Sequence, residues 1–401
     1  MRNRRPAPAA PSAAAVIILL AVSVAAARPS FAQDSRQKPA EKKLDKAQTQ
    51  EIQALVKLVT EVSYGQPAPS DFPVVWQNHY LKARDQRTFV PYIISIPQGS
   101  IANPSVSMYV RVVKKGNEPV LVPRVWADPG ANLYYKPGDE RFGTAGQGSF
   151  MSEADALKAG YTAASGPKDP KAAARQEFAF EDVSFPELKA PEGKGPYRLA
   201  RALSVLPGDY TIYVVVRERP ATEKKNAAAP KTGLVKQSIT VPDYWLPGLT
   251  MSSIIVADKV DPLTTPVPES QLADNPYAFG TTRLTPAVAD RTFTKKDELA
   301  VIFLVYNTAE TNKKPDVAVE YGFYQRTEGS EKFFNKTNPQ MFNAETLPPQ
   351  FDLAAGHQLV AGQSIPLALF PEGDYRLEIK ITDKVAGKSI VQSVNFTVTS
   401  Q

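Results

Sequence analysis

The chain has 401 residues, a formal net charge of +6, 36 prolines and no cysteine, and its length suggests two or three domains. Without cysteine there can be no disulfide bond and no lipid on a lipobox cysteine, and with only two histidines, far apart in sequence, a zinc site is not expected. Four basic residues precede residue 33, so removing that segment lowers the basic count from 47 to 43 against 41 acids, a near-neutral balance that argues against nucleic acid binding.

Residues 1–32 have the pattern of a secretory signal peptide. Arg2, Arg4 and Arg5 form a positive start, an apolar run follows from residue 13 to residue 27, and Ser30-Phe31-Ala32 offers small residues for cleavage. The alternative is an uncleaved membrane anchor, but the run is shorter than the roughly 20 residues that span a bilayer. We therefore expect a mature protein without a transmembrane span that is periplasmic or extracellular.

Residues 33–66 combine a polar, charged start with one amphipathic helix. Apolar residues recur near helical spacing from Leu44 to Val62, which predicts a helix over about 42–62. Such a helix could dock on a partner or mediate oligomerisation, or it could pack on the following domain. We favour the packing interpretation.

Residues 67–243 change to short apolar runs with period two, which indicates a first β-sandwich domain. Strands are expected over 92–96, 107–113, 120–126, 197–205, 209–217 and 234–241. The stretch near 143–175, rich in Ala, Gly, Ser and Lys, is interpreted as an insertion in this domain, and residues 217–231 as a solvated hairpin loop.

Residues 244–290 are interpreted as a proline-rich connector that includes a strand-like run over 251–257. A second β-sandwich domain is expected over 291–401, with strands over 299–306, 317–324, 364–369, 374–382 and 388–399. The predicted fold class is mainly β, with tandem immunoglobulin-like or fibronectin-like antiparallel sandwiches and a short N-terminal helix.

The two halves share an internal repeat. The first half carries Leu206-Pro207-Gly208-Asp209-Tyr210, and the second half carries the matching Phe370-Pro371-Glu372-Gly373-Asp374-Tyr375. In each half this segment begins a strand, and a turn and a final strand follow. The period is too long for a solenoid, so it indicates a duplicated domain. Tyr210 and Tyr375 stand two residues before a core position, as the tyrosine corner of immunoglobulin-like sandwiches does, and we interpret both as structural.

The segments 249–257, 275–280 and 299–307, together with the Gly373-Asp374-Tyr375 strand, carry a family resemblance. This half resembles the immunoglobulin-like β-sandwich regions attached to secreted bacterial proteins of the GWxTD-domain and von Willebrand factor A-related kinds. The chain has neither a Gly-Trp-x-Thr-Asp segment nor an Asp-x-Ser-x-Ser motif. The resemblance thus implies an exported accessory or adhesive module and no activity.

No catalytic constellation stands out. His79 and His357 are far apart in sequence and lie in no recognisable motif, so we assign no catalytic residue and no cofactor. Asp128, Asn132, Asp139 and Glu140 form an oxygen-rich loop that could suit calcium, but the spacing matches no EF-hand, and we assign no metal site.

Large aromatic residues are the better functional candidates. Trp76, Trp126, Tyr134 and Tyr135 could stack on sugars or anchor a protein partner if they are exposed, or they could fill cores. Trp245 lies in the connector, where we expect it to pack between the sandwiches.

The sequence favours a non-enzymatic exported protein that binds another envelope or extracellular protein, or a polysaccharide. A carbohydrate-binding module and an enzyme of unrecognised type are the alternatives. Strand addition at an exposed sheet edge is one specific form of the leading idea.

Overall fold

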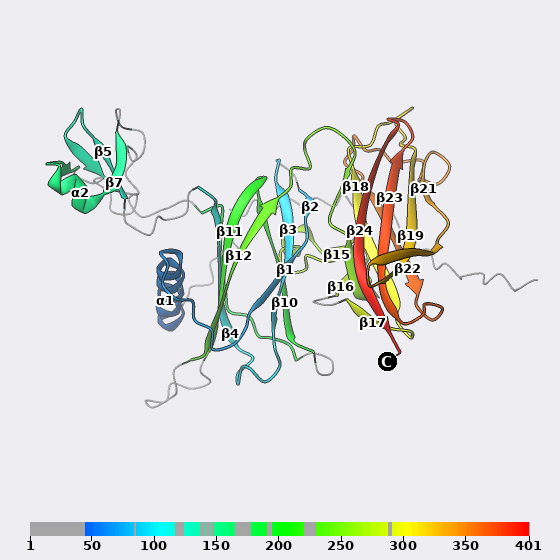
Figure 1. Cartoon of the computed structure of the whole chain (residues 1–401), viewed down its shortest axis with the longest axis horizontal. Helices are drawn as coiled ribbons and strands as arrows, with labels where there is room; N and C mark the ends of the chain where they lie inside the picture. The colour runs from blue at the N-terminus through cyan, green and yellow to red at the C-terminus, as the bar shows by residue number, and fades with distance from the viewer. Residues whose placement is uncertain are drawn as a thin grey trace, which may run out of the picture. The chain divides into compact units, whose positions relative to one another are not determined.

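A computed structural model describes residues 45–83, 86–116, 124–136, 141, 145, 148–164, 178–190, 195–219, 230–287 and 291–400 (Figure 1). The chain divides into an N-terminal unit, residues 31–245 with 273–276, and a C-terminal unit, residues 246–272 with 277–401. Both consist mainly of antiparallel β-sheets, which confirms the predicted fold class. The predicted signal peptide lies outside the described residues. Within them, no helix is both long and apolar enough to cross a membrane.

The N-terminal unit is a sandwich of two four-stranded sheets. One sheet contains β1 (Val75–Asn78), β2 (Leu81–Lys82), β3 (Thr88–Ile96) and β10 (Tyr197–Val205); the other has the order β12 (Thr232–Val241), β11 (Gly208–Glu218), β4 (Val106–Lys114) and β9 (Phe180–Ser184). Tyr92 and Ile94 of β3 pack against Val110 of β4 and Ile212 of β11 in one buried cluster. This core uses alternate residues of each strand, as the period-two pattern predicts.

Helix α1 (Lys46–Ser63) covers the outer face of the β4–β11 sheet. Its start is fixed by a capping box in which Asp45 accepts the Gln48 backbone N–H at 2.7 Å and the Gln48 side chain accepts the Asp45 N–H at 3.1 Å. Leu55 and Val59 are fully buried in a cluster with Tyr213 of β11 and its neighbours. The apolar face of the helix is therefore occupied by its own sheet, as the favoured interpretation expects.

Two arginines of this sheet bind the helix at points far apart along it. Arg111 of β4 donates to the Thr60 hydroxyl at 3.0 Å, and Arg217 of β11 lies 3.4 Å from a Glu51 carboxylate oxygen. Arg111 is buried, with its guanidinium 4.0 Å from the Phe178 ring centroid. These polar contacts fix the register of the helix on the sheet.

A separate small sheet lies within the same stretch of chain. It has the order β7 (Ser149–Ser152), β5 (Arg124–Asp128), β6 (Leu133–Tyr135) and β8 (Thr162–Ala163), and it packs with α2 (Glu153–Lys158). The sequence placed a strand over 120–126 in the sandwich and an insertion near 143–175. Instead, β5 already belongs to the inserted sheet, because Val125 and Ala127 pack with Tyr134 and Ala156 and not in the sandwich core.

The C-terminal unit has two larger sheets. One contains β13 (Thr250–Met251), β14 (Ile255–Pro262), β15 (Ala278–Phe279), β16 (Thr282–Pro286), β18 (Glu298–Tyr306) and β22 (Leu359–Pro366). The other contains β17 (Thr292–Thr294), β19 (Val317–Thr327), β20 (Ser330–Lys336), β21 (Gln340–Phe342), β23 (Gly373–Asp383) and β24 (Lys388–Thr399), and a 3-10 turn spans Glu269–Gln271. Phe303 of β18 meets Tyr321 of β19 in the core between the two sheets.

The segment predicted as a proline-rich connector, 244–290, is largely part of this second core. It supplies four strands of one sheet, and β14 pairs with both β16 and β18. Val256 and Ile254 are buried with the core residues of β18. The strand-like run predicted over 251–257 overlaps β13 and the start of β14, whereas β15 and β16 were not predicted. Prolines argue against a strand because a proline cannot donate to a sheet ladder, yet Pro262 and Pro286 are tolerated here at strand ends.

The repeat in the sequence is matched by equivalent strands in the two units. β11 pairs with β4 and β12, and β23 pairs in the same way with β19 and β24. The hairpins start alike, with Gly208 at φ 142° and Gly373 at φ 139°, in a region that favours glycine. The aspartate after each glycine accepts a hydrogen bond from the threonine that faces it on the next strand. Thr240 donates to Asp209 at 2.6 Å, and Thr397 donates to Asp374 at 2.7 Å.

Candidate functional site

The four aromatic residues named from the sequence make contacts within the fold. The Trp76 ring stacks on Tyr92 with centroids 4.4 Å apart, and its indole N–H donates to Asn78 at 2.9 Å. Trp126, in the inserted sheet, donates its indole N–H to the Ala145 carbonyl at 2.7 Å. Trp76 and Trp126 therefore belong to different sheets, and each has a structural partner.

The two tyrosines beside Trp126 are both buried. The Tyr134 hydroxyl donates to Glu153 at 2.8 Å, and the Arg141 guanidinium lies 4.5 Å from the Tyr135 ring centroid. The ammonium of Lys136 also binds Glu153, at 2.8 Å. The four aromatic side chains thus do not come together as the open, coplanar platform that sugar stacking requires.

The histidines and the oxygen-rich loop also have local partners. His79 is buried between β1 and β2, while His357 accepts the Asp352 backbone N–H through Nδ1 at 3.0 Å and packs on Phe351. Asp128 accepts the Gly130 N–H at 2.9 Å, and Asn132 follows in a turn. Asp139 and Glu140 lie outside the described residues. Among the residues that are described, no three ligating side chains gather as a metal site would need.

Tyr210 and Tyr375 occupy equivalent places in the two units. Each side chain is buried, and each hydroxyl donates to a backbone carbonyl four residues upstream: Leu206 at 2.7 Å and Pro371 at 2.8 Å. Burial raises the pKa of both phenols. These bonds tie the strand start to the preceding loop, which is the geometry of a tyrosine corner.

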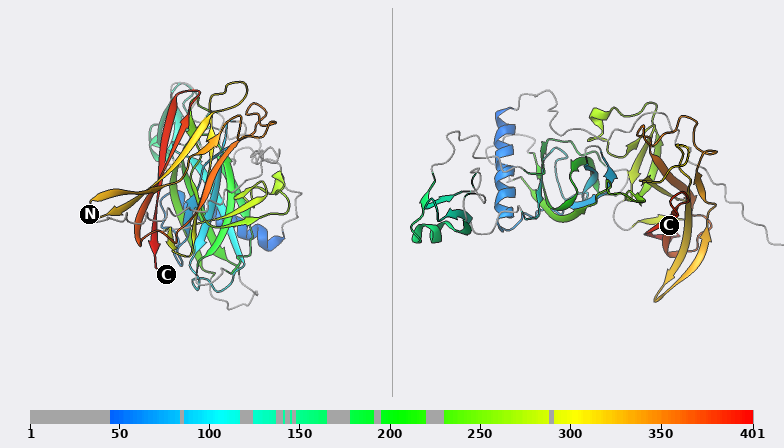
Figure 2. Two further views of the ribbon diagram at one scale, coloured as in Figure 1. Left: turned by 90° about the vertical axis from the view of Figure 1, so that its right-hand side faces the viewer. Right: turned by 90° about the horizontal axis from the view of Figure 1, so that it is seen from above.

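An exposed site that the sequence did not reveal lies on the β19–β20 hairpin and the adjacent β23. Figure 2 shows this hairpin extending from the sheet in two views. Six residues of these strands form what we call the hairpin patch: Tyr324, Arg326, Glu331, Phe333, Arg376 and Glu378.

Neighbouring phenylalanines of β20 point in opposite directions. Phe334 faces inward, with its ring centroid 4.9 Å from Phe370 and 5.5 Å from Tyr375. Phe333 faces outward and keeps 53% of its surface exposed, with its ring edge-on to Tyr324 at 5.8 Å. The inward ring anchors the strand on an aromatic core, and the outward ring remains available to a partner.

Tyr324 forms the floor of the patch. A side-chain carbon at Gly322 would lie 3.4 Å from the Tyr324 ring, an ordinary van der Waals distance, so the ring packs against the strand backbone at this glycine. The Arg376 guanidinium stands 4.4 Å from the Tyr324 ring centroid, within cation–π range. Tyr324 is thereby held between the glycine backbone, Arg376 and Phe333.

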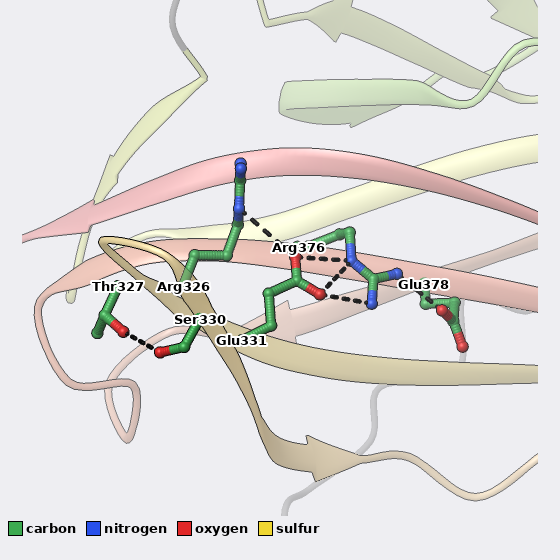
Figure 3. Close-up of polar contacts among 6 residues, drawn as sticks. All are labelled: Arg326, Thr327, Ser330, Glu331, Arg376 and Glu378. Atoms are coloured by element: carbon green, nitrogen blue, oxygen red, sulfur yellow. Dashed lines mark hydrogen bonds and ion pairs between the residues drawn. The ribbon is translucent and has the colours of Figure 1, made fainter.

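A charge network fixes Arg376 in this position (Figure 3). Its Nε and Nη2 donate to Glu331 at 2.9–3.0 Å, its Nη1 donates to Glu378 at 2.7 Å, and Arg326 lies 3.5 Å from Glu331. The hydrogen bonds from Arg376 lower the pKa of Glu331, and the bonds to both glutamates raise the pKa of Arg376. The network crosses three neighbouring strands and so pre-orders long side chains at the surface.

The patch has the composition of a protein-binding surface. Tyrosine, phenylalanine and arginine are enriched at the energetic centres of protein interfaces. Side chains that are already ordered lose less conformational entropy on binding. Sequence analysis missed β20 because Ser330-Glu331-Lys332 shows no apolar alternation, although Gly329, at φ 77°, is a turn signal between two aromatic runs.

No family model and no curated protein matches this chain, including those for the GWxTD and von Willebrand factor A kinds. Among solved structures it is similar to the native conformation of alpha-2-macroglobulin from E. coli, at 12% sequence identity and a TM-score of 0.20. The match covers 82% of this chain and 17% of that protein, so the chain spans less than a fifth of its length. A match of this kind assigns no family.

Proposed function

We propose that this chain is an exported, non-enzymatic protein that binds another protein at the cell envelope through the hairpin patch. The observation that carries the proposal is the outward Phe333 ring, which stands beside a Tyr324–Arg376 pair ordered by Glu331. Export is supported by the residue pattern of 1–32, and it places the protein in the periplasm or outside the cell.

The chemistry of the patch favours a protein partner with a mixed apolar and polar surface. Phe333 offers an apolar anchor, while Arg376 and Glu331 largely satisfy each other and expose no strong net charge. A partner can therefore cover the centre of the patch without burying an unpaired charge, which is the main penalty at such interfaces.

The experiment that tests the proposal is a pull-down with chemical crosslinking from the native envelope. The bait is the chain from Gln33 onward with a C-terminal tag, and captured proteins are identified by mass spectrometry. We expect a reproducible partner that is lost with Phe333→Ser. Val75→Ser serves as the matched control, because Val75 is also 53% exposed but lies in the N-terminal unit.

Two results would contradict the proposal. The first is equal capture of the partner by the Phe333→Ser bait and the unaltered bait. The second is retention of the unaltered bait on cell-wall polysaccharide with no captured protein, which would favour a carbohydrate-binding function.

A further inference from the structure

In the C-terminal unit, the edge strand β24 leaves a long stretch without a partner strand on one side. β24 pairs with β23 from Lys388 to Val398, and on its other side β17 pairs only with Thr397–Thr399. Among the described residues, no strand pairs with residues 388–396 on that side. We call this stretch the free β24 edge.

The other edges of the same unit are short or protected. β20 carries Glu331, Lys332 and Lys336 and is interrupted by an irregularity opposite Phe323 and Tyr324. On β22, the backbone N–H of Gly362 donates to the Gln340 side chain at 3.3 Å. β13, β15 and β17 have two or three residues each. Charges, irregular pairing and short length are the usual devices against unwanted strand addition.

The free β24 edge lacks these devices. The Thr397 N–H donates to Arg291 and the Thr399 carbonyl accepts from Lys295, so odd-numbered residues direct their backbone groups to this side. The register with β23 is regular, so the alternation extends along the strand and gives the free edge four odd-numbered residues: Ser389, Val391, Ser393 and Asn395. None is charged or a proline, and all four are exposed.

We propose that the free β24 edge pairs with the same edge of a second copy of this chain, antiparallel and about a two-fold axis. With the axis at Val391, each Val391 faces its counterpart, and Ser389 faces Ser393 of the other copy. Val391 is the one large apolar side chain on the outer face of this strand, and 54% of its surface is exposed. Self-pairing puts the two Val391 side chains in contact as a cross-strand pair and brings no like charges into register.

The available length fits a copy of β24. One end of the edge is closed by β17, which begins to pair at Thr397, and the other end is closed by the turn before Lys388. With the axis at Val391, residues 388–394 of one copy face residues 394–388 of the other, and this pairing fits within the free stretch 388–396. The proposal does not rest on the hairpin patch, whose Phe333 lies on β20 at the opposite edge of the sheet, although the patch residues Arg376 and Glu378 on β23 face Asn395 and Ser393 of β24.

A single engineered cysteine tests the register, since the chain has no cysteine of its own. Facing residues of a hydrogen-bonded antiparallel pair have Cα atoms about 5.5 Å apart, within the roughly 4.4–6.8 Å that a disulfide spans. Under mild oxidation of the full mature chain we expect Val391→Cys to give a covalent dimer. A mixture of Ser389→Cys and Ser393→Cys chains should crosslink to each other, and neither should crosslink alone. Phe333→Cys, equally exposed, is the control and should stay monomeric on a denaturing gel.

Sedimentation velocity tests the association itself. The unaltered mature chain should sediment as a dimer, and Val391→Lys should raise its dissociation constant by about tenfold or more, because like charges then face each other across the axis. Phe333→Lys, on the opposite edge, should leave the dimer intact. A monomeric unaltered chain over the whole concentration range, or equal crosslinking of Val391→Cys and Phe333→Cys, would overturn the proposal.

Discussion

Removing one hydroxyl from Tyr375 tests how far the tyrosine corner holds the C-terminal unit together. The hydroxyl donates to the Pro371 carbonyl at 2.8 Å, and the side chain is fully buried. Tyr375→Phe keeps the ring and its stacking on Phe396 at 5.3 Å, so it removes the hydrogen bond alone. The loss of one such bond should lower the free energy of unfolding by about 1 kcal/mol, and by up to ~1.5 kcal/mol because the carbonyl is left without its donor.

Intrinsic fluorescence separates the two units in this experiment. All three tryptophans, Trp76, Trp126 and Trp245, belong to the N-terminal unit, so their emission reports unfolding of that unit. Far-UV circular dichroism reports both units. Tyr375→Phe should lower the transition seen by circular dichroism by about 2–4 °C for a unit of this size and leave the tryptophan transition in place. Tyr210→Phe should lower the tryptophan transition and leave the transition of the C-terminal unit, as seen by circular dichroism, in place.

Tyr375→Ala shows how much stability the whole Tyr375 side chain contributes, for comparison with the hydroxyl alone. It removes the buried ring as well and should cost about 3–5 kcal/mol. Tyr375→Phe and the unaltered chain unfolding at the same temperature would refute the structural role of the hydroxyl. A shift of the tryptophan transition by Tyr375→Phe would refute the assignment of the two corners to separately unfolding units.

The remaining predictions concern the hairpin, the buried tyrosines and the helix. Phe333→Ser should change stability by no more than about 0.5 kcal/mol, whereas Phe334→Ser should cost about 1–3 kcal/mol in chemical unfolding because its ring packs on the core. Burial raises the pKa of Tyr321, so the free energy of unfolding should fall as pH rises above ~10, where unfolded tyrosines ionise and the folded one stays neutral. Tyr321→Phe should make this fall with pH less steep. An equally steep fall in the variant would contradict the role of Tyr321 in it. Leu55→Ala should speed hydrogen exchange of the backbone amides in α1, because Leu55 is buried against the sheet. Lys57→Ala, at an exposed position of the same helix, should leave the exchange rate unchanged. Equal protection of α1 in both variants would contradict its packing on the sheet.

The sequence predicted best those strands whose two faces differ in solvent exposure. In β23, Tyr375, Leu377 and Ile379 alternate with Arg376 and its polar neighbours, and that alternation alone placed the strand within a residue at either end. The wholly buried run of β11 was also found, because it is rich in β-branched residues and follows a glycine turn. The fold class followed from these strands.

Local pattern could not show which face a side chain occupies after folding. Nothing in the sequence distinguishes Trp76 stacked on Tyr92 from an exposed tryptophan, because the partner ring lies on another strand. The hairpin patch was missed for the same reason: Glu331 and Arg376 are 45 residues apart and meet only through the pairing of β19 with β20 and β23. Helix α1 was expected from its spacing, but its position against Tyr213 required the sheet.

Site-specific photocrosslinking tests the central claim most directly. A photoreactive phenylalanine analogue is placed at position 333 of the full chain in its native host, and a second chain carries it at position 75 as the equally exposed control. The account predicts that irradiation produces a discrete crosslinked protein from position 333 and none from position 75. The same adducts from both positions, or none from position 333 at native expression, would contradict a protein-binding role for the hairpin patch.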